Sequence, residues 1–106
     1  NVTAFTASDF GRTLDSNGQG SDHSWGAHHL IMGGAVRGGE TYGTWPETRL
    51  GGPNDVGRGS LLPTTAVEQY AGTLAKWFGV PDSSMTDVVP RAANWNTLDL
   101  GFMNAA

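Results

Sequence analysis

The N-terminal sequence Val2-Thr-Ala-Phe-Thr6, followed by Ala7-Ser-Asp-Phe-Gly-Arg-Thr13, has the pattern of a β-strand that ends in a polar loop. β-Branched and aromatic residues without helical spacing favour a buried strand over residues 2–6. In open α/β sheets, ligands bind in the crevice beyond the carboxyl ends of the strands. Asp9 therefore lies where we expect functional side chains, in a fold of the α/β class.

The rest of the chain predicts one more strand, one helix and long loops. Residues 15–22 are a loop by composition, residues 29–36 are a second short strand, and residues 39–63 are a long loop rich in glycine and proline. Thr65-x-x-Glu68 has the form of a capping box, and the apolar spacing from Val67 to Phe78 predicts the main helix over about residues 65–78. Gly79 ends this helix. The tail, residues 82–106, contains Val88-Val89-Pro90 and the segment from Trp95 to Phe102, which read as irregular or short-strand packing segments.

Composition excludes several classes of protein. The 106 residues include no cysteine, and the net charge is −4. The six basic residues are dispersed along the chain, so we expect no nucleic-acid partner. The longest apolar run, residues 30–36, is far shorter than the roughly 20 residues that span a bilayer, so we expect no transmembrane helix and no signal peptide. Because Asn1 stands at a strand already under way, we expect residues 1–106 to be a single fragment of a larger domain.

The first thirty residues gather most of the metal-binding potential. Asp9 and His23, presented from two adjacent strand ends, can hold a divalent ion such as zinc, manganese or calcium, and Asp22 and His28 can complete the site. Arg12 can hold an anionic ester with its planar fork of donors. The alternative is that Asp9 caps a turn, that Asp22 and His23 are solvated loop residues, and that Arg12 pairs with a surface acid.

Three further patterns each have two interpretations. The sequence Asp15-x-Asn-Gly-x-Gly-x-Asp22 suits a calcium-binding loop or an ordinary surface turn. Three aromatic residues can line a sugar or aromatic ligand site, or can anchor irregular loops; these are Trp25, Tyr42 and Trp45. In a strand, His28 and His29 face opposite sides, so at most one of them can join His23.

An ordered set of motifs resembles a known family over essentially the whole chain. The motifs are Ser8-Asp-Phe-Gly-Arg-Thr13, Asp22-His23, residues 28–39 with Tyr42-Gly43, Gly57-Arg-Gly59, the helix over residues 64–80, and Leu100-Gly-Phe102. Together they resemble the C-terminal portion of a bacterial domain-of-unknown-function family, family 1501. That family is typically exported by the twin-arginine route and placed in the alkaline phosphatase and sulfatase superfamily.

The resemblance implies a partial alkaline-phosphatase-like sandwich with a metal site at the strand ends. Asp9 matches the acidic ligand of the superfamily, and His23 matches its last histidine ligand. Phe10 stands where the superfamily places a second ligand histidine, which implies one ion or none. The nucleophile of the superfamily has no match in these residues, so the resemblance implies half a site in a periplasmic or secreted protein.

Two functional hypotheses follow. The first is a fragment of a metal-dependent hydrolase-like protein acting on small anionic phosphate or sulfate esters, with Asp9 and His23 as ligands, Asp22 or His28 in support, and Arg12 on the anion. The second is a non-catalytic exported binding or structural protein that self-associates as a homo-oligomer to cover a sheet edge and apolar surface. Phe10 favours the second hypothesis.

Overall fold

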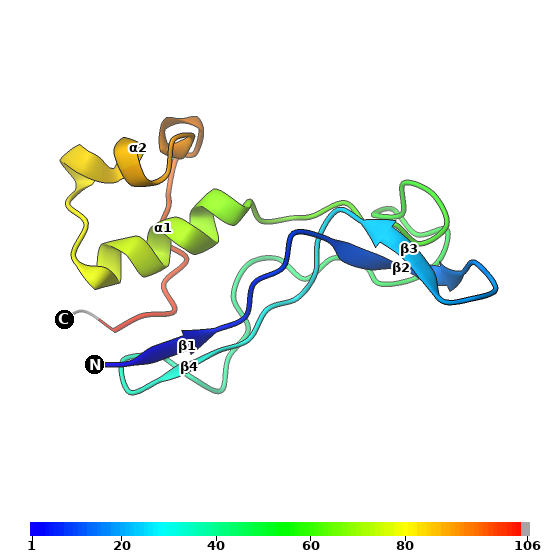
Figure 1. The fold of residues 1–106 in the computed structure, drawn as a ribbon, viewed down its shortest axis with the longest axis horizontal. Helices are drawn as coiled ribbons and strands as arrows, with labels where there is room; N and C mark the ends of the chain where they lie inside the picture. The colour runs from blue at the N-terminus through cyan, green and yellow to red at the C-terminus, as the bar shows by residue number, and fades with distance from the viewer. Residues whose placement is uncertain (105–106) are drawn as a thin grey trace. The chain divides into compact units, whose positions relative to one another are not determined.

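The computed structural model describes residues 1–104 and confirms a small mixed α/β fold with one main helix and long loops (Figure 1). Its strands are β1 (Thr3–Phe5), β2 (Gly11–Ser16), β3 (Ser21–Ser24) and β4 (Ile31–Gly33). Its helices are α1 (Val67–Phe78) and α2 (Met85–Val88), with 3-10 turns at Asp82–Ser84 and Ala92–Asn94. β1 pairs with β4, and β2 pairs with β3.

The described chain forms two compact units. We call residues 1–4, 31–43 and 65–104 the helical unit, and residues 5–30 and 44–64 the hairpin unit. The expectation that residues 1–106 are a single fragment of one larger domain stays a prediction. As expected, no helix among the described residues combines the length and apolarity needed to cross a bilayer.

Both predicted strands are present but shorter than expected. The first occupies Thr3–Phe5, and the second occupies Ile31–Gly33 instead of residues 29–36. The Thr6 side chain explains the late start of β4, because Thr6 Oγ1 accepts the Leu30 N–H at 2.9 Å, where a strand would offer a carbonyl. The prediction that His29 belongs to this strand is therefore wrong.

The prediction of a loop over residues 15–22 is wrong at both ends, because β2 and β3 form an antiparallel hairpin there. The connection is the short turn of residues 17–20, closed by the Asn17 N–H, which donates to the Gly20 carbonyl at 2.9 Å. Asn17 Oδ1 also accepts the Gln19 N–H at 2.9 Å. Asn-Gly followed by a polar residue favours a tight hairpin turn, and it overrides the polar composition of the flanking strands.

Helix α1 confirms the predicted helix, although its cap differs. The helix begins at Val67, with Ala66 as its N-cap, so the proposed capping box of Thr65 and Glu68 is wrong by one residue. The Gln69 side-chain oxygen accepts the Ala66 N–H at 3.0 Å, which satisfies this backbone donor from the third helical position. Gly79 ends the helix in the left-handed conformation, with φ of 115°.

The core of the helical unit lies between α1 and the C-terminal turns. Met85, Val89 and Ala92 are buried and form one apolar cluster, against which Ala71, Ala75, Val80 and Leu98 pack. Phe102 is only 1% exposed, and its ring lies 5.9 Å from those of Tyr42 and Tyr70. The tail thus forms helical turns at Asp82–Ser84, Met85–Val88 and Ala92–Asn94, which were not expected, whereas residues 95–102 are irregular, as expected. The apolar side chains of Met85 and Val89 stabilise these turns through burial.

The hairpin unit has a different interior. Its buried residues are the glycines Gly11, Gly52 and Gly59, and no described hydrophobic side chain in it is fully buried. The backbone of residues 58 and 59 hydrogen-bonds to β2, at 3.0 Å from the Leu14 nitrogen to the Gly59 oxygen. A Cβ atom on Gly11 would lie 1.7 Å from the Gly26 oxygen, so the two backbone segments touch. Backbone contact replaces side-chain packing in this unit.

Candidate functional site

The register of the β2–β3 hairpin places Arg12 directly opposite His23. Directly opposite residues of an antiparallel pair lie on the same face. The Phe10 ring stacks on the His23 ring, with 3.7 Å between the centroids and 12° between the planes. The Arg12 guanidinium carbon lies 4.9 Å from the centroid of the same Phe10 ring. We call these three residues, Phe10, Arg12 and His23, the hairpin cluster.

Phe10 is the residue that orients the other two side chains of the hairpin cluster. Its ring is half-buried, whereas Arg12 and His23 are exposed. Arg12 Nη1 donates a hydrogen bond to the Ser21 carbonyl at 2.7 Å, which fixes one edge of the guanidinium. A cation over an aromatic face is also attracted by the ring quadrupole. The alternative in which Arg12 pairs with a surface acid is not realised among residues 1–104, where its hydrogen-bond partner is a carbonyl.

Asp9 lies exposed in the bend just before Phe10. The hydrogen bonds of this bend come from Ser8, whose Oγ donates to the Phe10 carbonyl at 2.8 Å and accepts the Phe10 N–H at 3.4 Å. Ser8, not Asp9, therefore caps the turn. Within residues 1–104 the Asp9 carboxylate makes no hydrogen bond or ion pair, and the residue is exposed, so the carboxylate is available to a ligand.

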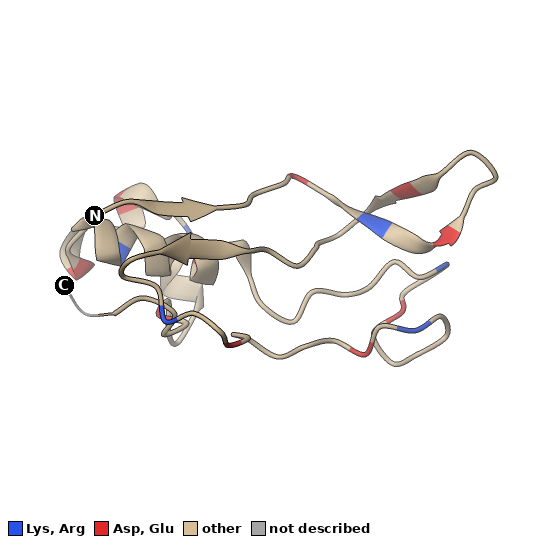
Figure 2. Cartoon of the chain, turned by 90° about the horizontal axis from the view of Figure 1, so that it is seen from below, with Lys and Arg blue, Asp and Glu red and all other residues tan. Residues whose placement is uncertain are grey.

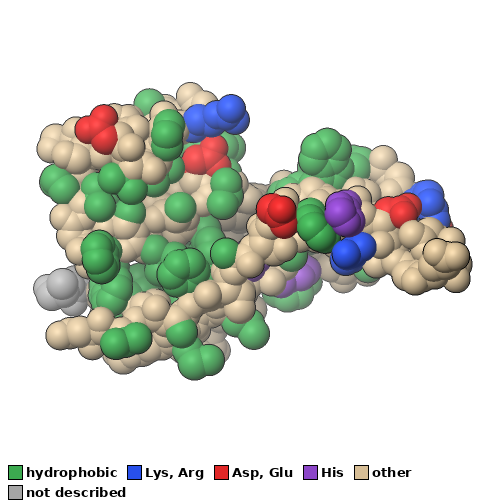
Figure 3. All heavy atoms as spheres, viewed as in Figure 1, with side chains coloured by type: hydrophobic (Ala, Val, Ile, Leu, Met, Phe, Trp, Pro, Cys, Tyr) green, Lys and Arg blue, Asp and Glu red, His purple; other side chains and the backbone are tan. Residues whose placement is uncertain are grey.

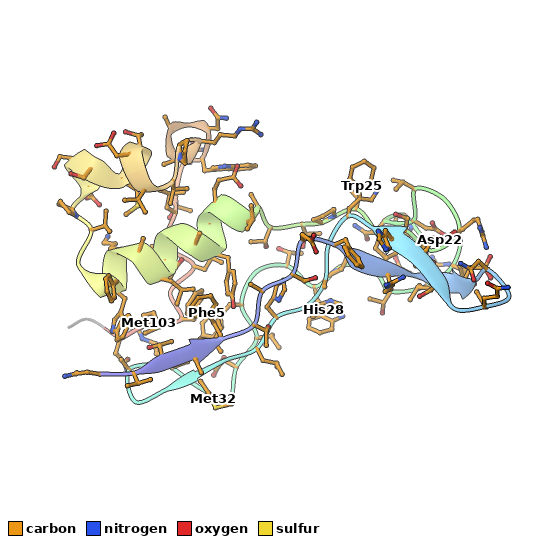
Figure 4. All side chains as sticks on the ribbon, in the orientation of Figure 1. Phe5, Asp22, Trp25, His28, Met32 and Met103 are labelled. Atoms are coloured by element: carbon orange, nitrogen blue, oxygen red, sulfur yellow. The ribbon has the colours of Figure 1, made fainter. Side chains whose placement is uncertain are left out.

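Asp22 and His28 have other partners. Asp22 accepts a hydrogen bond from Asn17 Nδ2 at 2.9 Å and pairs with Arg58 Nη1 at 3.0 Å. The His28 ring stacks on Trp45 at 3.9 Å between centroids. Figure 4 shows Asp22 and His28 well apart within the hairpin unit. Over the described residues, no three histidine, aspartate or glutamate side chains gather as a metal site would require. The ligand roles of the four residues stay predictions.

Arg58 is the site residue that sequence reasoning missed. Its guanidinium reaches Asp22 at 3.0 Å, the Ser16 carbonyl at 3.0 Å and Asp15 at 3.5 Å. Arg58 therefore holds Asp15 and Asp22, the two carboxylates of the pattern that suits either a calcium-binding loop or a surface turn, and that pattern is here part of a hairpin. The signal was present in the Gly57-Arg-Gly59 motif, but its partners lie 36 to 43 positions away in the sequence.

Asp55 organises the loop that carries Arg58. Its carboxylate accepts three backbone N–H groups, from Gly51 at 2.8 Å, Gly57 at 2.8 Å and Gly59 at 2.9 Å. The N–H groups of Gly51 and then Gly57 are the largest influences that hold the pKa of the Asp55 carboxyl below its ordinary value. Asp55 thus fixes the backbone on both sides of Arg58.

The aromatic residues considered for a sugar site do not share one function. Tyr42 donates its hydroxyl to the Arg37 carbonyl at 2.5 Å and contacts Phe102, so it anchors a loop of the helical unit. Trp45 stacks on His28 in the hairpin unit. Trp25 is 69% exposed. Figure 2 shows the lysine and arginine residues at separate places along the chain.

A comparison with known protein families gives one match. The family described as "Protein of unknown function (DUF1501)" matches residues 1–88. The matched range contains all four strands and both α-helices of the described chain. Searches of curated proteins and of solved structures returned no match.

Proposed function

We propose that this chain, which belongs to the DUF1501 family of proteins of unknown function, is part of a hydrolase-like protein acting on phosphate or sulfate esters. Kinship with the alkaline phosphatase and sulfatase superfamily, and twin-arginine export to the periplasm or beyond, belong to the same proposal. In it, Arg12 binds the anionic ester, and Asp9 and His23 are ligands of a divalent ion.

The hairpin cluster is the observation that carries the proposal. A guanidinium has five N–H donors, and Arg12 uses one of its terminal nitrogens on the Ser21 carbonyl. The remaining donors are exposed, in the planar fork that suits two oxygens of a phosphate or sulfate group. His23, directly across the hairpin, presents an exposed ring beside the same anion. In this proposal, Phe10 holds the Arg12 guanidinium and the His23 ring in position.

The described residues supply only part of a metal site, because fewer than three candidate ligands gather at any point of residues 1–104. The proposal is therefore a half-site, in which Asp9 and His23 act with ligands from another segment or chain. A zinc, manganese or calcium ion held there supplies charge neutralisation of the ester. The residues of this chain bind and orient: Arg12 holds the anion, and Phe10 holds the His23 ring.

Zinc titration followed by NMR of the histidine side chains tests the half-site. We expect saturable changes at His23, weakened at least several-fold in Asp9→Asn and absent in His23→Gln. His28→Gln is the matched control, because His28 is also exposed but stacks on Trp45. Zinc-dependent changes that are the same in Asp9→Asn and in the unaltered protein would contradict the shared site.

Inorganic phosphate tests the anion role of Arg12. We expect phosphate to shift the Arg12 and His23 signals, and Arg12→Lys to weaken binding because a lysine cannot make the bidentate contact. Arg49→Lys is the control, since Arg49 lies in the same unit and pairs with Glu47. Equal phosphate affinity of Arg12→Lys and the unaltered protein would remove Arg12 from the proposal.

A second candidate function is a non-catalytic protein that self-associates as a homo-oligomer. The observation in its favour is that five hydrophobic residues of the described chain are buried, whereas fourteen large ones are exposed. In the helical unit, Phe78 is 84% exposed, Val2 80% and Val67 71%. Figure 3 shows hydrophobic side chains spread over the visible face of this unit. Contiguous exposed apolar surface is typical of interaction surfaces, and in this candidate function these residues contribute to one.

Sedimentation equilibrium tests this candidate. We expect the unaltered chain to associate with rising concentration, and the Phe78→Lys and Val67→Lys variants to associate less. Thr86→Lys is the control, because it adds the same charge to an exposed polar position of the same unit. A chain that stays monomeric at all concentrations contradicts self-association and leaves the ester proposal unaffected.

A further inference from the structure

The helical unit contains a cleft that the proposed ester site does not use. It is bordered by the second half of α1, by the turn that leads into α2, and by residues 92–99. Its volume is about 380 Å³. Pockets for small ligands are typically about 300–1,000 Å³, so the cleft is large enough for one small molecule.

The walls of the cleft are fixed by the packing of α1 against residues 98–100. A Cβ atom on Gly72 would lie 2.9 Å from the Leu98 Cβ, so the helix backbone and this segment are in close contact. Thr73 is 3% exposed; its hydroxyl donates to the Leu98 carbonyl at 2.8 Å and accepts the Leu100 N–H at 2.9 Å. Buried Met85 and Ala92 form the floor. The cleft is therefore preformed.

The rim of the cleft carries polar groups without partners. Among residues 1–104, the side chains of Lys76, Asp82, Thr86 and Asn96 make no hydrogen bond or ion pair. Asp99 uses its Oδ1 to accept the Gly101 N–H at 2.8 Å, which leaves the other carboxylate oxygen for a ligand. The rim thus offers donors and acceptors together, with one ammonium group and two carboxylates.

The aromatic wall of the cleft is Trp95, which is 40% exposed. An indole face presents a flat apolar surface, and the surrounding side chains both donate and accept hydrogen bonds. The two carboxylates outnumber the single ammonium, so the local charge disfavours a phosphate or sulfate ester. The ligand should therefore have an apolar face for the indole, groups that both donate and accept hydrogen bonds, and no negative charge. A neutral molecule with one apolar C–H face and many hydroxyl groups meets these three conditions.

We propose that this cleft binds a neutral saccharide, with a sugar ring stacked on Trp95 and its hydroxyls bonded to Lys76, Asp82, Asn96 and Asp99. The site is separate from the ester site, because none of its lining residues belongs to the hairpin cluster and its ligand class is uncharged. The proposal therefore does not depend on the proposed function, and failure of one leaves the other standing.

NMR titration of the full chain tests the proposal, with the tryptophan indole N–H signals as the readout. The probes are glucose, N-acetylglucosamine and maltotriose, with inorganic phosphate as the charged comparison. We expect a saturable shift of the Trp95 signal with at least one sugar and none with phosphate. The exposed Trp25 of the hairpin unit is the internal control and should not shift.

Variants separate stacking from folding. Trp95→Ala should weaken sugar binding about tenfold or more, because it removes the aromatic contact, whereas Trp95→Phe should keep most of it. Asp82→Asn should weaken binding several-fold, while Trp25→Ala leaves it unchanged. Unchanged helix signals in circular dichroism show that each variant is folded. Absence of a saturable Trp95 shift with every sugar, or binding of phosphate at the same position, would overturn the proposal.

Discussion

In the helical unit, Met85, Val89 and Ala92 form a buried apolar cluster, whereas the buried residues of the hairpin unit are three glycines. The first unit is held by side-chain packing, and the second by backbone contacts, by the Asp55 carboxylate and by Arg58. The two units should therefore respond to opposite changes. Removing a side chain should damage the helical unit, and adding one should damage the hairpin unit.

The largest expected effect is that of Phe102→Ala. Phe102 is 1% exposed and contacts both tyrosine rings, so its removal leaves a cavity and should lower the free energy of unfolding by about 3–5 kcal/mol. The measurement is urea denaturation followed by the helix signal in circular dichroism. Phe78→Ala is the control, because Phe78 is 84% exposed and its loss should change stability by about 0.5 kcal/mol or less. Equal effects of the two variants would show that Phe102 is not a core residue.

The next effect is that of Gly59→Ala in the hairpin unit. Gly59 has φ of 79°, and an added Cβ would lie 2.5 Å from the Leu14 Cβ, so we expect a loss of about 1–3 kcal/mol. Gly51→Ala is a close control, because Gly51 has φ of 73° but nothing within 4 Å of the added atom. Hydrogen exchange of the Leu14 amide, which bonds to Gly59, reports the difference. Similar exchange rates of the Leu14 amide in the two variants would refute the close packing of β2 on Gly59.

Acidification should act on the hairpin unit through Asp55. Backbone N–H groups of Gly51 and Gly57 lower the pKa of the Asp55 carboxyl in the folded chain, so its stabilisation is fully present above the ordinary aspartate pKa of about 4. That stabilisation is lost as the pH falls through the lowered folded-state pKa. We expect the amide signals of Gly51, Gly57 and Gly59 to change together below about pH 4. Asp55→Asn should abolish the shared transition, and persistence of the transition in that variant would contradict the assignment.

The smallest expected effect is that of Arg58→Met. The Arg58 side chain is 53% exposed, and exposed ion pairs contribute about 0–1 kcal/mol, so the loss of stability should be of that size. The loss should shrink at high salt, since exposed charges are screened. Arg49→Met removes the exposed ion pair with Glu47, and its loss of stability should be no larger than that of Arg58→Met. A loss well above that of Arg49→Met that is independent of salt would show that Arg58 acts through packing.

The sequence predicted the elements of the helical unit better than those of the hairpin unit. Two local signals were sufficient to predict α1: the apolar spacing from Val67 to Phe78, and the glycine that follows it. The β2–β3 hairpin was missed since its strands are polar, and their apolar alternation is too weak to predict strands. The Asn-Gly turn at residues 17 and 18 was the one local signal for it.

The candidate site was predictable only in part, for a similar reason. Composition identified Arg12 and His23 as chemistry-bearing residues, but their pairing follows from the register of a hairpin that was not expected. Asp22 and His28 have partners that lie far away in the sequence, Arg58 and Trp45. A single sequence carries no signal for such long-range contacts, so the engagement of both residues became visible only in three dimensions.

The close approach of the Gly11 backbone to the Gly26 carbonyl governs the strand pairing one residue away. Gly11 pairs with Ser24 in the same ladder in which Arg12 pairs with His23. Any side chain at position 11 would push against that carbonyl, and the ladder would slip or open beside it. A single hydrogen atom in place of a methyl group thus keeps Arg12 and His23 opposite each other in the register of the hairpin.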